Sequence, residues 1–252
     1  MPGGPVVTML TDFGTSDSYV AEMKGVVLSR VPDAVLVDIT HDIAPGDIRS
    51  AQFVLQRAWA RFPAGSVHLA VVDPGVGSAR RALAAGHAGH GFVAPDNGLL
   101  TPVLAGATIV SLPIPDGAAP TFHGRDVFAP AAATLASGAP LDTLGEPIAD
   151  PVRLSAPRPE PGDGMLTGTV VYVDRFGTLV TNLPADRLPP AARIEIAGRD
   201  AGPLRRTFSD VHPGALVPLI GSGGTVEVAV RDGSAARVLG AGTGAVARAL
   251  FQ

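Results

Sequence analysis

The 252-residue sequence contains no cysteine and has no run of basic residues. The lack of cysteine excludes disulfide bonds, thiol catalysis and cysteine-ligated zinc, and it fits a reducing compartment. Lys and Arg number 19 against 23 Asp and Glu, and the net charge of −4 argues against a nucleic-acid or anionic-membrane partner. No apolar run approaches the roughly 20 residues of a membrane span. We therefore expect a cytoplasmic protein that binds neither nucleic acid nor membranes.

The residues that are present favour a folded, loop-rich protein. Hydrophobic residues make up 46% of the chain and charged residues 17%, proportions that argue against disorder. The 31 glycines and 24 prolines indicate many turns. A chain of this length forms one large domain or two modest ones.

The first part of the chain alternates strand and helix patterns. Short β-branched runs predict strands at 6–10, 34–39, 67–72 and 108–111. Apolar residues at helical spacing predict helices at 18–29, 47–59 and 128–137. Ser16 or Asp17 is expected to cap the first of these helices. Because repeated strand–helix units form parallel sheets covered by helices, residues 1–146 are expected to form an α/β domain with a largely parallel sheet.

A change of composition separates this part from the rest. Residues 147–164 are expected to form a linker, because five prolines disfavour helices and central strands there: Pro147, Pro151, Pro157, Pro159 and Pro161. Beyond it the strand patterns are short and divided by glycine and proline. They lie at 167–173, 179–182, 193–196, 216–220 and 226–230. This pattern predicts a smaller all-β, barrel-like domain over 165–252.

Four loops combine glycine with charge, and two of them directly follow predicted strands. They are TDFG at 11–14, VVDPGVGSAR at 71–80, FHGRD at 122–126 and DRFGT at 174–178. In parallel sheets, ligands bind beyond the carboxyl ends of the strands. Each loop taken alone is compatible with a plain turn.

Two of the six histidines stand out as candidate functional groups. His41 and His123 each have an aspartate close by in a loop. His68 lies in a predicted strand and is expected to be a hydrogen-bonded sheet residue. His87 and His90 are interpreted as surface turn residues, because they lie in a stretch rich in glycine and alanine.

Taken together and in order, these loops resemble one family. The motifs are TDFG, THDI, VVDPGVGS, PDNGLL, FHGRDVFAP and DRFGTLVTNL. They are similar to those of the S-adenosyl-L-methionine hydrolases, the SAM hydroxide adenosyltransferases related to fluorinase and chlorinase. The resemblance runs from about Val6 to the C-terminus. It implies an N-terminal α/β domain, a C-terminal barrel-like domain and a homotrimer whose nucleoside site lies between subunits, with no cofactor and no metal.

The resemblance also implies catalytic residues. Family hydrolases place an aspartate, an arginine and a histidine around the attacking water, and the matching residues here are Asp73, Arg80 and His123. Arg81 is adjacent, so either arginine remains a candidate. The halogenating relatives have a tyrosine where this chain has Asp73. Water is a poor nucleophile, and Asp73 and His123 are expected to orient it and accept its proton while Arg80 stabilises the developing hydroxide.

Substrate contacts are implied by the same motifs. Asp12 matches the aspartate that binds the ribose hydroxyls, and Asp174 matches one near the methionine amino group. The remaining implied substrate-binding positions are Phe176, Thr178, Ser222 and Ala235. Thr178 stands where many relatives have asparagine, and Gly46 stands where the fluorinase has tryptophan.

The activity that the resemblance implies is hydrolysis of S-adenosyl-L-methionine to adenosine and L-methionine. Water would attack C5′ in line with the departing sulfur. Three alternatives remain at this point. They are halide-dependent adenosyl transfer, a nucleoside-binding protein with little turnover, and a metal-dependent phosphoesterase that uses Asp12, Asp73 and His123.

Overall fold

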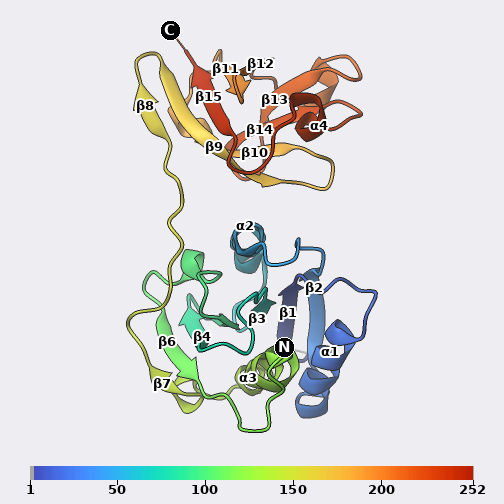
Figure 1. The fold of residues 1–252 in the computed structure, drawn as a ribbon, viewed down its shortest axis with the longest axis vertical. Coiled ribbons are helices and arrows are strands. Elements are labelled where there is room, and N and C mark those ends of the chain that lie inside the picture. Colours follow the sequence, from blue (N-terminus) through green and yellow to red (C-terminus); the bar gives the residue numbers. More distant parts are fainter. Residues whose placement is uncertain (1–2, 252) are drawn as a thin grey trace. The chain divides into compact units, whose positions relative to one another are not determined.

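The computed structural model describes residues 3–251, so Met1, Pro2 and Gln252 lie outside the described residues. The chain divides into two compact units, Met1–Leu154 and Ser155–Gln252 (Figure 1). The division falls within 147–164, the segment expected to be a linker. Two short strands overlap that segment, β7 (Glu146–Pro147) and β8 (Glu160–Gly162), and both lie at sheet edges, where proline is tolerated.

The first unit is built on a sheet of seven strands among the described residues. In chain order they are β1 (Val6–Thr11), β2 (Val35–Thr40), β3 (Val67–Val71), β4 (Ala82–His87), β5 (His90–Pro95), β6 (Thr108–Leu112) and β7 (Glu146–Pro147). Their order across the sheet is β2-β1-β3-β5-β4-β6-β7. β1, β2, β3 and β5 are parallel to one another, whereas β4, β6 and β7 join through antiparallel pairings.

The prediction of a largely parallel sheet is therefore wrong, because the sheet is mixed. The cause is the hairpin of β4 and β5, which the sequence patterns did not predict. These strands are rich in alanine, glycine and histidine, residues with little β-propensity, and burial in the sheet overrides that preference. Ala88 and Gly89, both at positive φ, form the turn between them.

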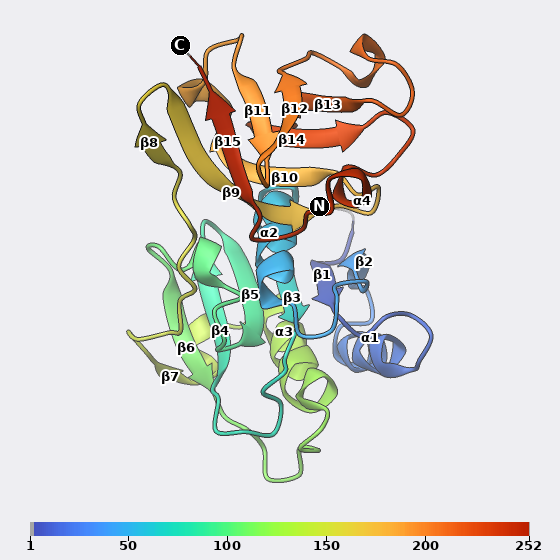
Figure 2. The ribbon, with the colours of Figure 1, turned by 45° about the horizontal axis from the view of Figure 1, so that its top comes forward.

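Helices cover both faces of this sheet. They are α1 (Tyr19–Arg30), α2 (Ile48–Ala58), α3 (Ala129–Ala136), the short helices η1 (Trp59–Arg61), η2 (Thr101–Val103) and η4 (Leu141–Thr143), and the π-helix η3 (Gly124–Phe128). Met9 packs in the same apolar cluster as Met23 of α1. Its neighbour Leu10 packs with Leu55 of α2 in a second cluster. Alternate residues of β1 thus pack against α1 and α2, which lie on opposite faces of the sheet. Figure 2 shows the sheet together with α1 and α2.

The helices begin close to where the sequence predicts, with one correction. Asp47 caps α2 as an acceptor from the Ser50 amide, at 3.0 Å. The residue that precedes α1 is Ser18, not Ser16 or Asp17, and its side chain makes no capping bond. The Ser18 hydroxyl instead donates to Glu22 at 2.7 Å.

The second unit is a nearly closed antiparallel sheet. Its strands are β8 (Glu160–Gly162), β9 (Met165–Val173), β10 (Leu179–Pro184), β11 (Arg193–Ile196), β12 (Arg199–Pro203), β13 (Leu216–Ile220), β14 (Thr225–Val230) and β15 (Val246–Leu250). Its helices are η5 (Ala185–Arg187), η6 (Phe208–Asp210) and α4 (Ala235–Leu239). The main path runs β12-β11-β15-β9-β10-β14-β13. A bridge between Arg205 and Leu219 joins its two ends, so the predicted barrel-like domain is confirmed.

Among residues 3–251, the structure has no helix that is both long enough and apolar enough to cross a bilayer.

Candidate active site

The loops that follow β1, β2 and β3 meet at one edge of the first unit's sheet. These strands are parallel, so their carboxyl ends lie at the same edge. The Gly14 amide donates to the His41 carbonyl oxygen at 2.8 Å. The Gly46 amide donates to Asp12 Oδ2 at 2.7 Å. Asp12 is thereby fixed at this edge, as its place directly after a predicted strand suggested.

The loop from Asp73 to Arg80 packs against the segment that leads to His123. Gly77 has a φ of 76°, a conformation that L-residues with side chains rarely adopt. A Cβ at Gly77 would lie 2.5 Å from the Pro120 carbonyl oxygen. Only glycine therefore allows the two segments to approach so closely, and this approach brings His123 to the edge where Asp73 lies.

Asp73, Arg80 and His123 form one contact group. Arg80 Nε donates to Asp73 Oδ1 at 3.0 Å, and Arg80 Nη2 bonds Asp73 Oδ2. The same Nη2 lies 2.8 Å from His123 Nδ1. The Arg80 guanidinium carbon lies 5.2 Å from the centre of the buried Phe128 ring, close enough for a cation–π contact. The three predicted catalytic residues thus lie together.

The structure also distinguishes the two neighbouring arginines. Arg81 turns away from Asp73, and its Nη2 pairs with Asp96 at 2.7 Å. Its Nη1 pairs with Asp150 at 2.8 Å. These ion pairs connect the start of β4 to Asp96 and to the end of the first unit, so we interpret Arg81 as a structural residue. Arg80 is the arginine that contacts Asp73 and His123.

The contact with Arg80 fixes which nitrogen of His123 carries the proton. A guanidinium has donors only, so Nδ1 must accept the bond and the neutral ring carries its hydrogen on Nε2. Burial, followed by the charge of Arg80, lowers the pKa of His123, while Asp73 and Asp126 oppose this effect. The arrangement therefore holds a neutral imidazole whose remaining nitrogen is a donor.

One donor of this group has no protein partner. Arg80 Nη1 is buried and makes no hydrogen bond within the described part of the chain. Its side chain is 10% exposed and that of Asp73 is 5% exposed, so both are largely removed from solvent. A buried donor without a partner is costly, and sites that bind ligands retain such groups.

His41 and His90 do not belong to the contact group of Asp73, Arg80 and His123, and each instead connects strands of the sheet. His41 Nδ1 lies 2.8 Å from Thr11 Oγ1, and its buried Nε2 lies 3.1 Å from Asp38 Oδ1 but makes no hydrogen bond within the described residues. His41 was a candidate in sequence terms, and it instead ties β1 to β2. His90 is not a surface turn residue, because it lies buried on β5 with its Nδ1 3.2 Å from His68 Nε2.

In the second unit, one loop brings three predicted residues together. Asp174 Oδ1 accepts the amide hydrogens of Phe176 at 2.9 Å and of Thr178 at 2.8 Å. Gly177 in this loop has a φ of 81°, and a Cβ there would lie 2.0 Å from Ser234 Oγ. Phe176 is 76% exposed, whereas Thr178 is buried. Asp174 therefore shapes the loop that displays Phe176.

The other two predicted residues of this unit are placed differently. Ser222 lies before β14, whereas the Asp174 loop lies beside the opposite end of that strand, where β10 begins. Six residues of strand span about 20 Å, so Ser222 lies well away from the Asp174 loop along β14. Ala235 has no exposed surface.

Sequence reasoning assigned no role to Phe128, Arg125 or Asp126, although all three stand in the motif FHGRDVFAP. Phe128 supports the guanidinium of Arg80. Arg125 and Asp126 form an ion pair at 2.7 Å directly after His123. The sequence signal was the pair of charges next to a candidate histidine.

The described residues include no cluster of three or more His, Cys, Asp or Glu side chains arranged to hold a metal ion.

Comparison with known proteins places this chain in a family. The SAM hydroxide adenosyltransferase N-terminal domain matches residues 7–145, and the C-terminal domain of the same family matches residues 168–248. The chain belongs to the SAM hydroxide adenosyltransferase family. Both units of the structure are therefore accounted for by one family.

Individual relatives agree with this assignment. The (R)-S-adenosyl-L-methionine hydrolase of Thermus thermophilus is 44% identical, over 97% of this chain and 99% of its own. A fluorinase of an Actinoplanes species is 32% identical over 72% of each chain. The crystal structure of an uncharacterized conserved protein from Thermotoga maritima has a TM-score of 0.90 and 34% identity, over 97% of this chain and 99% of that one.

Proposed function

We propose that this protein hydrolyses S-adenosyl-L-methionine to adenosine and L-methionine. The relative from Thermus thermophilus carries this hydrolase name at 44% identity over nearly the whole chain. The observation that carries the proposal is the group of Asp73, Arg80 and His123, with a buried donor of Arg80 left over. This set suits a reaction in which the difficult partner is water.

The chemistry of the substrate explains why these groups suffice. The water oxygen forms a bond to C5′ while the bond from C5′ to sulfur breaks. The electron pair of the broken bond stays on sulfur, which leaves as the neutral thioether of methionine. The leaving group needs no proton, so we propose that neither a cofactor nor a metal takes part. The protein has to orient the water and take one proton from it.

We assign the proton to the Asp73 carboxylate. Arg80 carries donors only, and His123 holds its proton on Nε2 while Nδ1 accepts from Arg80. Asp73 is thus the group of the three that has an acceptor to offer. The water keeps one lone pair for C5′, and its other lone pair accepts a hydrogen bond from His123 Nε2 or Arg80 Nη1. Holding water and substrate in line contributes about 7–11 kcal/mol in well-oriented systems.

Two substitutions separate the chemistry from binding. Asp73→Asn keeps the shape of the side chain but removes the acceptor, so we expect turnover to fall by about 10²–10⁴-fold with little change in adenosine affinity. Asp12→Ala should instead weaken adenosine binding first, because we assign Asp12 to the ribose. Single-turnover rates and adenosine calorimetry on both variants provide the test. Near-normal turnover of Asp73→Asn would remove the residue from the mechanism.

We also propose that the site is completed across a homotrimer of a cytoplasmic protein. This follows from the resemblance, and the 76% exposure of Phe176 beside Asp174 supports it, because a large apolar ring gains by packing against another surface. Thr178, Ser222 and Ala235 remain the further proposed substrate contacts. Mixing Asp73→Asn with Asp174→Ala chains should restore some native sites. Mixed trimers without activity would place each site within one chain.

Product analysis decides the function itself. The protein is incubated with S-adenosyl-L-methionine in heavy-oxygen water, with and without chloride and a chelator, and the products are separated by chromatography. We expect adenosine labelled at the 5′-hydroxyl, independent of both additives. Chloride-dependent products, chelator-sensitive turnover or unlabelled adenosine would each overturn the proposal, and bound nucleoside without turnover would indicate a binding protein.

A further inference from the structure

His123 lies between a turn and the π-helix η3, and the position of its side chain depends on how these two elements are placed relative to each other. On its N-terminal side, the Phe122 amide donates to the Ala119 carbonyl oxygen at 3.0 Å and closes a turn. On its C-terminal side, the π-helix η3 begins at Gly124. The imidazole bonds Arg80 at 2.8 Å, so its position depends on how this turn and this helix are joined.

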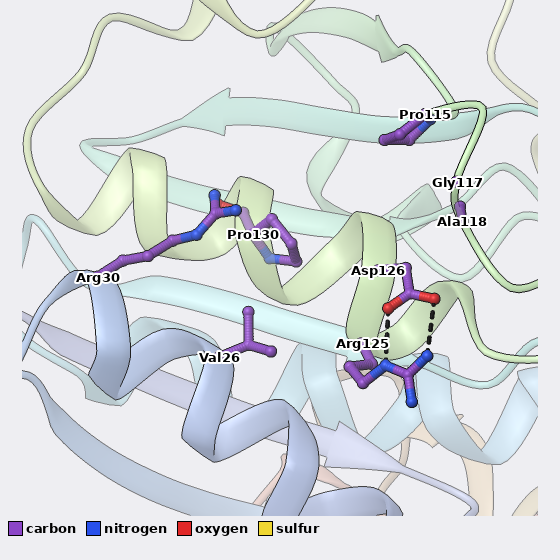
Figure 3. Close-up of a pocket in the computed structure, with 8 residues that line it drawn as sticks. All are labelled: Val26, Arg30, Pro115, Gly117, Ala118, Arg125, Asp126 and Pro130. Carbon is purple, nitrogen blue, oxygen red and sulfur yellow. Dashed lines mark hydrogen bonds and ion pairs between the residues drawn. The ribbon is translucent and has the colours of Figure 1, made fainter.

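Asp126 joins them. Its Oδ2 accepts the Ala119 amide hydrogen at 2.8 Å, which ties the helix back to the turn before His123. Its two oxygens also bond Arg125, at 2.7 Å from Nε and 3.0 Å from Nη2 (Figure 3). The hydrogen bond from the Ala119 amide to the Asp126 carboxylate therefore closes a ring of residues that contains His123.

Arg125 fastens this ring to the neighbouring helix. Its Nη1 donates to Glu22 of α1 at 2.9 Å, and its guanidinium carbon lies 5.0 Å from the centre of the Phe122 ring. Glu22 in turn accepts from Ser18 at 2.7 Å. The carboxylate of Asp126 thus organises contacts to the turn, to Arg125 and, through Arg125, to α1.

We propose that Asp126 is a positioning residue for the reaction, which holds His123 Nδ1 against Arg80 through the ring of contacts with Ala119 and Arg125. Asp126 does not touch the reacting atoms, and its effect passes through His123. The inference rests on the proposed function in one respect only, which is that His123 takes part in turnover. The placement of the imidazole is measurable without any turnover.

The charge of Asp126 gives this role a distinctive pH signature. The charged groups that act on His123 are Arg80 and Asp73 on the loop after β3, and Asp126 on its own helix. A nearby carboxylate stabilises the imidazolium, so Asp126 raises the pKa of His123 against burial and Arg80, which lower it. Removing the carboxylate moves the pKa of His123 further down. Turnover needs the neutral ring, so its acidic limb moves to lower pH.

Asp126→Asn is the main test, and Asp126→Glu is the conservative rescue. Asp126 and Arg125 line a pocket of about 280 Å³, which leaves room for the extra methylene of glutamate. We expect Asp126→Asn to lower kcat by about 10- to 100-fold, because small displacements of catalytic groups cost this much. KM should change by less than about threefold, since Asp126 does not contact the substrate. Asp126→Glu should recover most of kcat, and the exposed Asp142→Asn should match the wild type.

A double-mutant cycle shows whether the effect passes through His123. In a His123→Ala background, adding Asp126→Asn should cost nothing further, because the group that it positions is gone. An equal loss in both backgrounds would overturn the proposal. If Asp126→Asn does not fold, Glu22→Gln releases Arg125 from α1 at the protein surface, and it should lower kcat in the same direction by a smaller factor. Unchanged kcat in Glu22→Gln would then overturn it.

Nuclear magnetic resonance of the imidazole nitrogens separates this inference from the proposed function. Spectra of wild type and Asp126→Asn, with His123 assigned from His123→Ala, report its tautomer and pKa without substrate. We expect Nε2–H in the wild type and a lower pKa in Asp126→Asn. An unchanged pKa and tautomer would refute the positioning role even in an active enzyme. The expected change in a protein that does not turn over S-adenosyl-L-methionine would instead refute the function alone.

Discussion

Two stacked imidazoles in the first unit make its stability dependent on pH. His68 of β3 and His90 of β5 lie with ring centres 5.3 Å apart, and both are buried. Thr8 Oγ1 lies 2.8 Å from His68 Nδ1, and His68 Nε2 lies 3.2 Å from His90 Nδ1. Burial, and to a lesser extent His90, lowers the pKa of His68 from 6.5 to about 4.

The size and sign of the effect follow from this pKa. Unfolded His68 takes up a proton below about pH 6.5, whereas folded His68 stays neutral down to about pH 4, so acid favours the unfolded chain. The stability is complete above pH 6.5 and is lost as the pH falls toward 4. At about 1.4 kcal/mol per pH unit, the free energy of unfolding should fall by about 2 kcal/mol between pH 8 and pH 5 on account of His68.

Fluorescence of the single tryptophan provides the assay. Trp59 belongs to the same unit, and its ring centre lies 5.2 Å from that of His90, so denaturant unfolding followed at this residue reports on the first unit. His68→Asn removes the titrating group while its amide remains near Thr8. The variant should lose about 2 kcal/mol less than the wild type between pH 8 and pH 5. The exposed His212→Asn is the control.

The reasoning would fail if His68→Asn and wild type lost the same free energy over this range. Carboxylates cannot produce the difference, because they titrate mainly below this range. His90 shares the environment, and burial lowers its pKa too, so some pH dependence should remain in His68→Asn. Additional replacement of His90 should remove most of that remainder.

Two further pairs of substitutions test contacts of the first unit, the first pair by the same fluorescence assay and the second by turnover. Arg81→Ala should cost about 3 kcal/mol because it leaves the buried carboxylate of Asp96 without its charged partner. Asp150→Ala removes a side chain that is 82% exposed and should cost under about 1 kcal/mol. Equal losses of unfolding free energy would show that the exposed pair with Asp150 stabilises the unit as much as the buried pair with Asp96 does. Gly77→Ala should lower turnover far more than Gly106→Ala, since both have positive φ but Gly106 has nothing within 4 Å of an added Cβ. Similar activities would show that the close approach at Gly77 does not position the site.

Regular elements of the first unit were predictable where apolar patterns were strong. The strand predicted at 6–10 is confirmed as Val6–Thr11, and the helix predicted at 47–59 is confirmed as Ile48–Ala58. The strands Ala82–His87 and His90–Pro95 were missed, because their neighbours in the sheet stabilise them rather than their own β-propensity. The mixed character of the sheet follows from that hairpin, so no local pattern could indicate it.

The composition of the catalytic group was predictable, but its geometry was not. Motif order gave Asp73, Arg80 and His123, but the choice of Arg80 over the adjacent Arg81 rested on motif spacing alone. Neighbouring residues of extended chain point to opposite sides, so one arginine had to face Asp73 and the other had to face away. Their partners decide between them, and one partner of each arginine lies far away in sequence. His123 is 43 residues from Arg80, and Asp150 is 69 residues from Arg81.

The π-helix explains how the Arg80 guanidinium reaches both His123 and Phe128. Pro130 has no amide hydrogen to donate to Asp126, as an α-helix would require. The Ala129 amide instead bonds the Gly124 carbonyl oxygen, five residues earlier. The π-helix lies between His123 and the start of α3, so it sets the spacing between His123 and Phe128. The Arg80 guanidinium can then contact the Phe128 ring while its Nη2 bonds His123. The proline of the motif FHGRDVFAP therefore favours the π-helix, a role that the sequence alone did not indicate.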